Sequence, residues 1–228
     1  MILKINVNKF YSLPKYILWP VCILIAFFGG LPLGLTMMFS FKYSILFLLL
    51  FPVFLPVAIF SSSPVMRVSG YFIYYSPMLL GIKSKKKLDL HNGTTFDYFL
   101  NMKLKDKGAK ARYIILSYYV EGLLNIISEF ESGKLDSSLQ IEGTSYFFSD
   151  NTALKLGFKL QKPLLNYYLN FILYFVDLCF MYSYFKGNFS VPDIFSNKRA
   201  VTTADELCKR KDYLKSLLKT LNSRIKIS

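Results

Sequence analysis

Two apolar stretches near the start of the chain decide the fold. Residues 16–41, YILWPVCILIAFFGGLPLGLTMMFSF, are 26 uncharged residues in succession, and residues 43–66, YSILFLLLFPVFLPVAIFSSSPVM, are 24 more. A helix of roughly 20 apolar residues spans a bilayer core of about 30 Å. Glycine and proline are tolerated inside such helices when neighbours satisfy the freed backbone groups. We therefore expect a membrane domain of residues 1–67, an α-helical hairpin with transmembrane helices over about 16–39 and 43–63.

Charge is unevenly distributed along the chain. Residues 1–88 contain no Asp or Glu, and all 14 acidic residues lie in 89–228, mixed with basic ones. Lysines precede the first apolar stretch, Arg67 and several lysines follow the second, and only Lys42 lies between them. Basic residues are retained on the cytoplasmic side of a membrane. The sequence therefore predicts an integral, multi-pass protein of inner-membrane type with both termini in the cytoplasm.

Composition excludes several classes of protein. The chain has 228 residues, of which 53% are hydrophobic, and its mean hydropathy is +0.35. These values exclude a disordered chain, a collagen-like fibre and a disulfide scaffold. Three widely spaced cysteines and a single histidine form no metal-binding motif, so we expect no metal site and no bound cofactor.

The net charge of +14 indicates adhesion to a membrane. No DNA- or RNA-binding motif accompanies it, so nucleic acid is not an expected partner. A lysine cluster lies just beyond the second apolar stretch, where each lysine gains about 1 kcal/mol near an anionic surface. The sequence predicts that this cluster binds anionic lipid head groups, through Lys83, Lys85, Lys86 and Lys87.

Residues 68–162 are expected to form a small cytosolic α/β domain. Strands are predicted over 68–82, 86–91 and 94–104, where aromatic and β-branched residues alternate with turn signals. Apolar residues at helical spacing predict a helix over 111–130, followed by a strand over 139–148, a short helix over 150–156 and a strand over 158–160. This alternation is typical of α/β domains.

An aromatic segment follows, over residues 163–187. Its polar residues Asn166, Asn170, Tyr174 and Asp177 form one stripe at helical spacing. A third span would also export residues 186–228, which hold ten Lys or Arg against four acids, against the positive-inside rule. We therefore favour an amphipathic or interfacial helix over a third crossing of the membrane.

Residues 188–228 are interpreted as a basic tail that contains a C-terminal amphipathic helix over 204–222. Thr203 and Glu206 have the spacing of a capping box. Leucines occupy one face of this helix and lysines much of the rest. Such a helix docks on anionic lipid, on nucleic acid or on an acidic partner, or it packs its leucines inward.

The lone histidine is a candidate catalytic residue. His91 stands six residues before Asp97, and a histidine oriented by a carboxylate can act as a general base. The alternative is that His91 satisfies hydrogen bonds where a strand meets a turn. No local motif marks a Ser or Cys nucleophile, so a hydrolase is not supported.

Residues 94–160 have the order strand, glycine-containing loop, helix, strand and short helix. A basic loop, KDKGAKAR at 105–112, precedes the helix, and NTALKLGF at 151–158 ends in Gly-Phe. In these features the segment resembles the acyl-CoA-binding core of the GCN5-related N-acetyltransferase family. The resemblance implies that Gly108, Lys110 and Arg112 contact the phosphates of acyl-CoA at a helix N-terminus, and that Asn151 lies near the pantetheine. The family's tyrosine general acid has no counterpart here, so the resemblance implies no catalytic acid.

The same residues also fit a solvated loop before a helix and a glycine cap at its end. We therefore favour a membrane-tethered interaction module or complex subunit, which binds a protein partner or a second copy of the chain. The alternative is a membrane-anchored, acyl-CoA-dependent N-acyltransferase with acyl-CoA as its co-substrate. The sequence leaves open whether the protein is an enzyme.

Overall fold

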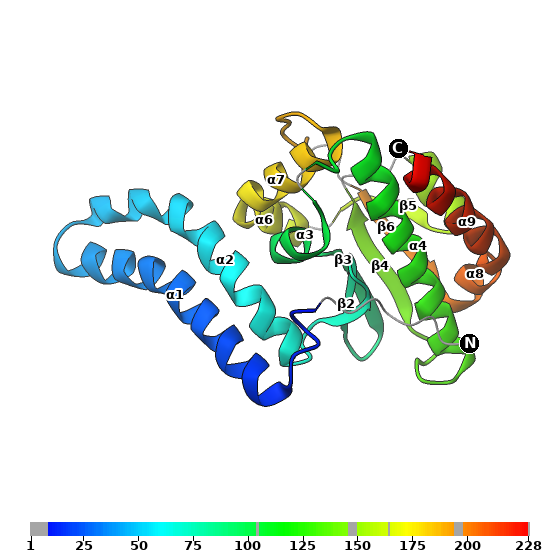
Figure 1. The fold of residues 1–228 in the computed structure, drawn as a ribbon, viewed down its shortest axis with the longest axis horizontal. Coiled ribbons are helices and arrows are strands. Elements are labelled where there is room, and N and C mark those ends of the chain that lie inside the picture. The colour runs from blue at the N-terminus through cyan, green and yellow to red at the C-terminus, as the bar shows by residue number, and fades with distance from the viewer. Residues whose placement is uncertain (1–8, 104, 146–149, 164, 194–197, 228) are drawn as a thin grey trace.

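A hairpin of apolar helices projects from an α/β domain (Figure 1). The structure, a computed structural model, describes residues 9–227 except 104, 146–149, 164 and 194–197. The hairpin consists of α1 (Lys15–Lys42), a short 3₁₀ helix η1 (Ile45–Leu50) and α2 (Phe51–Val68). By length and composition, Lys15–Lys42 with 28 residues and Ile45–Val68 with 24 can each cross a membrane. The predicted pair of long apolar helices is therefore confirmed.

Small side chains let the two helices of the hairpin approach closely. A β-carbon on Gly29 would lie 2.0 Å from the Ser61 hydroxyl oxygen, so a larger residue does not fit there without displacement. The Ser61 hydroxyl donates to the Val57 carbonyl at 2.7 Å, which satisfies it inside its own helix. Large apolar side chains point outward instead, and Phe28 is 64% exposed.

The domain is built on a six-stranded sheet with the order β1-β2-β3-β4-β6-β5. Strands β3 and β4 are parallel, and the other neighbouring pairs are antiparallel. Parallel neighbours need a crossover connection, which helix α4 supplies between β3 and β4. The strands are β1 (Ile73–Ser76), β2 (Leu79–Lys83), β3 (Lys87–Asn92), β4 (Gln140–Ser145), β5 (Lys159–Gln161) and β6 (Lys198–Thr203).

Helix α4 (Ala109–Glu131) packs against one face of this sheet and forms the centre of the core. A β-carbon on Gly122 would lie 2.6 Å from a Leu79 methyl group, so glycine allows the helix to approach β2 closely. Helices α8 (Ala204–Cys208) and α9 (Lys211–Ile227) also pack on α4, and Leu214 of α9 is fully buried. The helix predicted over 111–130 is therefore confirmed, and it is covered on two sides.

One predicted strand is a helix. Residues 94–104 were expected to be extended because they are rich in Thr, Phe and Tyr, but Thr95–Asn101 forms α3. Thr94 and Asp97 make a reciprocal capping box, in which the Thr94 amide donates to Asp97 Oδ2 at 2.8 Å and the Asp97 amide donates to Thr94 Oγ1 at 3.3 Å. This pair satisfies the free amides of the first turn, and it prevails over the strand propensity of the aromatic residues.

Other elements differ from the predictions in their boundaries. The strand expected over 68–82 contains the last residue of α2 followed by the hairpin β1–β2, and the helix expected over 204–222 is split into α8 and α9. The segment over 188–228 was interpreted as a tail beyond the domain, whereas its strand β6 lies inside the sheet between β4 and β5. The aromatic segment forms α6 (Leu165–Leu173) and α7 (Phe175–Lys186). The short helix predicted over 150–156 is α5 (Asp150–Lys155).

Candidate functional site

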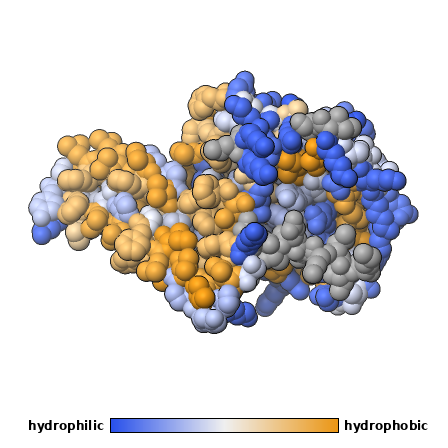
Figure 2. All heavy atoms as spheres, in the orientation of Figure 1, coloured by the Kyte–Doolittle hydropathy of each residue, from blue (hydrophilic) through white to orange (hydrophobic). Residues whose placement is uncertain are grey.

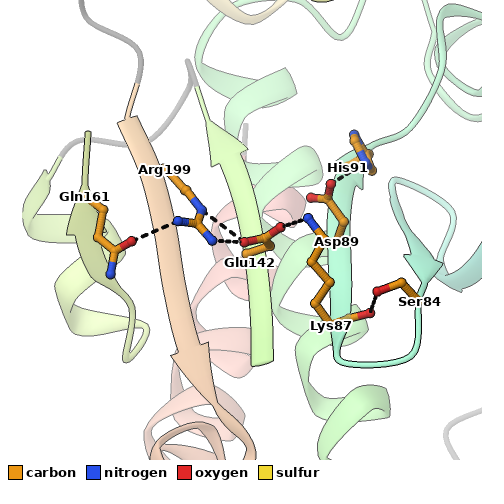
Figure 3. Close-up of polar contacts among 7 residues, drawn as sticks. All are labelled: Ser84, Lys87, Asp89, His91, Glu142, Gln161 and Arg199. Atoms are coloured by element: carbon orange, nitrogen blue, oxygen red, sulfur yellow. Dashed lines mark hydrogen bonds and ion pairs between the residues drawn. The ribbon is translucent and has the colours of Figure 1, made fainter. Parts of the chain in front are cut away.

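A cluster of charged and polar side chains lies on the face of the sheet that α4 does not cover (Figure 3). Side chains alternate along a strand, so residues 87, 89 and 91 of β3 share one face. The register pairs Asp89 with Glu142 on β4, and β6 and β5 continue the row. We call this set the sheet-face cluster; its members are Lys87, Asp89, His91, Glu142, Gln161 and Arg199.

Glu142 is the centre of the sheet-face cluster. Its side chain is fully buried, and it forms ion pairs with Lys87 on one side and Arg199 on the other. Arg199 donates from Nε to Glu142 Oε2 at 3.0 Å and from Nη1 to Gln161 Oε1 at 3.0 Å. The hydrogen bonds with Glu142, and its negative charge, raise the pKa of both Lys87 and Arg199 above their ordinary values. Both cations are therefore engaged by Glu142, and they hold its carboxylate in place.

Asp89 and His91 form the end of the cluster that Glu142 does not engage. His91 Nε2 lies 3.5 Å from Asp89 Oδ2, and the two side chains are 39% and 22% exposed. Within the described part of the chain, the His91 Nε2 and Asp89 Oδ1 atoms are buried and have no hydrogen-bond partner. A histidine beside a carboxylate can exchange a proton with a bound molecule or hydrogen-bond to it. These two atoms therefore have unused hydrogen-bonding capacity, whereas Lys87 and Arg199 are both paired with Glu142.

Tyr167 of α6 borders the sheet-face cluster. Its hydroxyl forms hydrogen bonds with Thr144 and Arg199. Burial raises the pKa of Tyr167, and the negative charges of Asp89 and Glu142 raise it further. The tyrosine therefore stays neutral beside two carboxylates.

The structure does not pair His91 with Asp97. The carboxylate beside His91 is Asp89, two residues before it on the same strand. Asp97 is fully buried, where it accepts hydrogen bonds from Thr94 and Tyr74 and pairs with Arg67. Asp97 therefore joins α2, β1 and α3, and the proposed dyad has Asp89 in its place.

The loop before α4 is covered by the end of α7. The Gly108 amide donates to the Tyr184 carbonyl at 3.0 Å, and Gly187 lies against Gly108. Lys110 lies 3.6 Å from Asp106. Gly108 and Lys110 were expected to contact phosphate. The Gly108 amide instead donates its hydrogen bond to the Tyr184 carbonyl, so it is not free to bind phosphate.

The two remaining residues of the expected acyl-CoA site lie in ordinary surroundings. The Arg112 guanidinium lies 5.8 Å from the centre of the Phe185 ring. Asn151 is an exposed residue of α5. Among the described residues, no three His, Cys, Asp or Glu side chains are grouped so as to hold a metal ion.

The four predicted lipid-binding lysines separate into two groups. Lys83 ends β2 and, with Lys85 and Lys86 in the following turn, is exposed. Lys87 instead pairs with Glu142 in the sheet-face cluster. The first three therefore remain available to a membrane surface, whereas Lys87 has an internal partner.

Sequence reasoning did not identify Glu142 and Arg199. One feature of the sequence could have indicated Glu142: it is an acidic residue inside a predicted strand, where an unpaired charge is rare. No comparable feature indicated Arg199, because residues 198–203 were not predicted to be a strand.

No protein-family model, no curated protein and no solved structure matches this chain. Function is therefore inferred from the chain's own residues.

Proposed function

We propose that this chain is an integral membrane protein whose α/β domain is held at the cytoplasmic surface of the bilayer as a membrane-tethered interaction module. The outward face of the hairpin carries the proposal. Phe41 is 86% exposed, Leu49 74% and Val53 61%. Contiguous apolar surface of this extent is unfavourable in water and favourable among lipid chains.

The distribution of basic residues along the hairpin supports a cytoplasmic position for the domain. Lys9 and Lys15 lie near the start of α1 and Arg67 near the end of α2, whereas Lys42 alone lies at the far turn. The excess of basic residues at the domain end of the hairpin favours the cytoplasmic side for the domain.

A rigid junction connects the hairpin to the domain. The Arg67 guanidinium lies 3.9 Å from the centre of the Tyr11 ring and 3.8 Å from that of Tyr74. Its Nη1 lies 3.3 Å from Asp97 Oδ1, and its side chain is 12% exposed. A largely buried cation between two rings and a carboxylate fixes the relative orientation of the elements that it joins. The domain is thereby held in one orientation relative to the hairpin, with the sheet-face cluster as its binding surface.

Two measurements test membrane insertion. The full chain, expressed in a bacterium, should stay in the membrane fraction after washes with high salt and with alkaline carbonate. Reporter fusions at the C-terminus and between Lys42 and Tyr43 should give opposite sidedness, with the C-terminus cytoplasmic. Release of the chain by carbonate would contradict the proposal.

The interaction role is tested by site-specific photocrosslinking in membranes. A photoreactive residue at Gln161, in the sheet-face cluster, should give one defined adduct, which is lost in the His91→Gln variant. The matched control is the same photoreactive residue at Lys219, which is exposed on α9. Equal adducts at both positions would indicate nonspecific contact and count against the proposal.

An acyl-CoA-dependent N-acyltransferase is the second candidate, and an apolar cavity favours it. The cavity has a volume of about 80 Å³, lies between the sheet, α4 and α5, and is lined by side chains that include Leu90, Leu123, Ala153 and Phe158. Apolar cavities of this kind accept short apolar groups. The engaged Gly108 amide is the observation that opposes this function.

Thermal melting in detergent with CoA, acetyl-CoA and a long-chain acyl-CoA tests the second candidate. A ligand present at about 100 times its Kd stabilises the protein by roughly 2.7 kcal/mol. The shift should disappear in Lys110→Glu and persist in the control Lys219→Glu. No shift with any of the three compounds would exclude acyl-CoA binding.

A further inference from the structure

Helices α6 and α7 form a sharply bent pair with an apolar outer surface. The axes of Tyr167–Leu173 and Phe175–Lys186 differ by 83°. We call residues 165–186 the elbow. Its exposed large side chains gather around the bend and are 41% to 66% exposed; they are Leu169, Ile172, Leu173, Tyr174, Phe175, Val176 and Phe180.

The inner side of the elbow is attached to the domain by apolar packing, with Met181 in the core, and by polar contacts. Asp177 is 7% exposed, and it accepts a hydrogen bond from Thr95 Oγ1 of α3 at 2.7 Å. The Tyr184 hydroxyl donates to the Lys103 carbonyl. The acid therefore faces the domain, while the outer side carries large apolar side chains where a helix on a water-soluble surface would carry polar ones.

Both ends of the elbow return to the same domain. At its start, Tyr167 contacts the sheet through Thr144. At its end, the Tyr184 carbonyl accepts the Gly108 amide of the loop before α4 at 3.0 Å. A segment whose two ends are held on one domain cannot cross a bilayer. Helix α7, the longer arm with 12 residues, is about 18 Å long, well short of a bilayer core of about 30 Å.

The apolar surface of the elbow continues that of the hairpin through α3. Phe60 of α2 lies 5.1 Å from Phe96 and 6.3 Å from Phe99 of α3, measured between ring centres. Phe99 is 74% exposed. Thr95 then connects α3 to Asp177 of the elbow. Figure 2 shows hydrophobic surface on the hairpin and on the part of the domain beside it, where Figure 1 places α6 and α7.

We propose that the bend of the elbow inserts into the acyl-chain region of the leaflet next to the domain and leaves again on the same side, as a re-entrant element. The occupant of its apolar surface is lipid, because that surface adjoins the hairpin whose own outer face requires a bilayer. This inference rests on the proposed membrane insertion of the hairpin.

Fluorescence quenching in vesicles tests the insertion. The chain is first freed of its three cysteines, Cys22, Cys179 and Cys208, by substitution with alanine, and an unchanged melting temperature confirms its fold. Single cysteines then carry an environment-sensitive dye at Leu173 of the elbow, at Val57 of α2 and at Lys219 of α9. The vesicles contain zwitterionic and anionic phospholipid, with or without brominated acyl chains, and iodide is the aqueous quencher.

The expected result is a large loss of fluorescence to brominated lipid at Leu173 and Val57, and loss to iodide only at Lys219. Quenching of Leu173 by iodide, with Val57 still quenched by lipid, would overturn the elbow inference and leave the proposed function intact. If brominated lipid quenches neither position, membrane insertion itself fails. Shielding of Leu173 from both quenchers would mean that protein, such as a second copy, covers the elbow, and would also overturn the inference.

Sidedness separates a re-entrant element from a third span. Single cysteines at Lys162, before the elbow, and Asn188, after it, should react with an impermeant maleimide from the same side of sealed vesicles. Reaction from opposite sides would show a crossing and contradict the proposal.

Discussion

Two buried carboxylates in this molecule have different surroundings. Asp97, at the junction of hairpin and domain, and Glu142, on the sheet, both have fully buried side chains that pair with an arginine. Around Asp97 the partner Arg67 is only 12% exposed. Around Glu142 the partners Lys87 and Arg199 are 46% and 18% exposed.

The difference indicates different roles. Asp97 caps α3 and also contacts β1 and α2, so its partners all lie within the chain and fix the junction. Burial raises the pKa of Asp97, and the contacts from Tyr74, Arg67 and Thr94 lower it in part. Glu142 instead belongs to a row that ends at the half-exposed His91. A closed cluster of this kind stabilises a fold, whereas an open one is available to a partner.

The largest effect is expected at the junction. Asp97→Ala leaves Arg67 buried without a counter-charge and removes the cap of α3, which should cost about 3–5 kcal/mol of unfolding free energy. Thermal or chemical unfolding in detergent measures it. The control is Asp212→Ala, because Asp212 is 98% exposed and lies 3.7 Å from Lys215. Equal melting of the two variants would show that the junction contributes no more than a surface pair.

A smaller loss is expected at the centre of the sheet-face cluster. Glu142→Gln keeps the volume and an acceptor oxygen but removes the charge that engages Lys87 and Arg199, which should cost about 1.5–3 kcal/mol. Lys87 is exposed enough to regain water, so the loss stays below that of Asp97→Ala. The same unfolding assay applies, with Glu131→Gln as control, since Glu131 pairs with Lys211 at 2.6 Å but is 47% exposed. A loss at least as large as at Asp97 would remove the contrast between the two clusters.

His91→Gln should separate stability from binding. The His91–Asp89 pair is partly exposed, so its removal should change the unfolding free energy by less than about 1 kcal/mol. The yield of the Gln161 photoadduct should nevertheless fall, because the variant removes the imidazole from the cluster. Strong destabilisation without any change in photoadduct would assign the whole sheet-face cluster to the fold.

The smallest effect is expected at the surface ion pair of Glu206 and Lys209, which sets the scale for the others. Contact with Lys209 at 2.8 Å lowers the pKa of Glu206 below its ordinary value. The folded chain therefore releases this proton at a lower pH than the unfolded chain. The stabilisation is complete above the unfolded pKa and is lost as pH falls through the folded pKa.

Melting curves of the original chain and of Glu206→Gln should therefore differ slightly at neutral pH and coincide in acid. Glutamine preserves the capping position, so the comparison isolates the charge. A difference that grows in acid would have the wrong sign.

The sequence by itself determined the hairpin and the central helix. An uninterrupted apolar run such as residues 16–41 can be stable only in a helix that meets lipid or a large core, so local composition suffices. In α4, apolar residues at helical spacing, Ile115, Leu123 and Ile126 among them, specify a buried face without information from elsewhere in the chain.

Only the tertiary structure decided which charges meet. Glu142 reaches Lys87 and Arg199 because β4 lies between β3 and β6. Strand order and register depend on pairing between segments more than fifty residues apart, which local patterns do not specify. Helix α3 is a case in which a local signal was sufficient but was not used. Its capping box is present in the sequence, but the prediction gave more weight to the strand propensity of its aromatic residues. The hairpin could thus be predicted from composition, whereas the sheet-face cluster depends on pairing between strands that are far apart in the sequence.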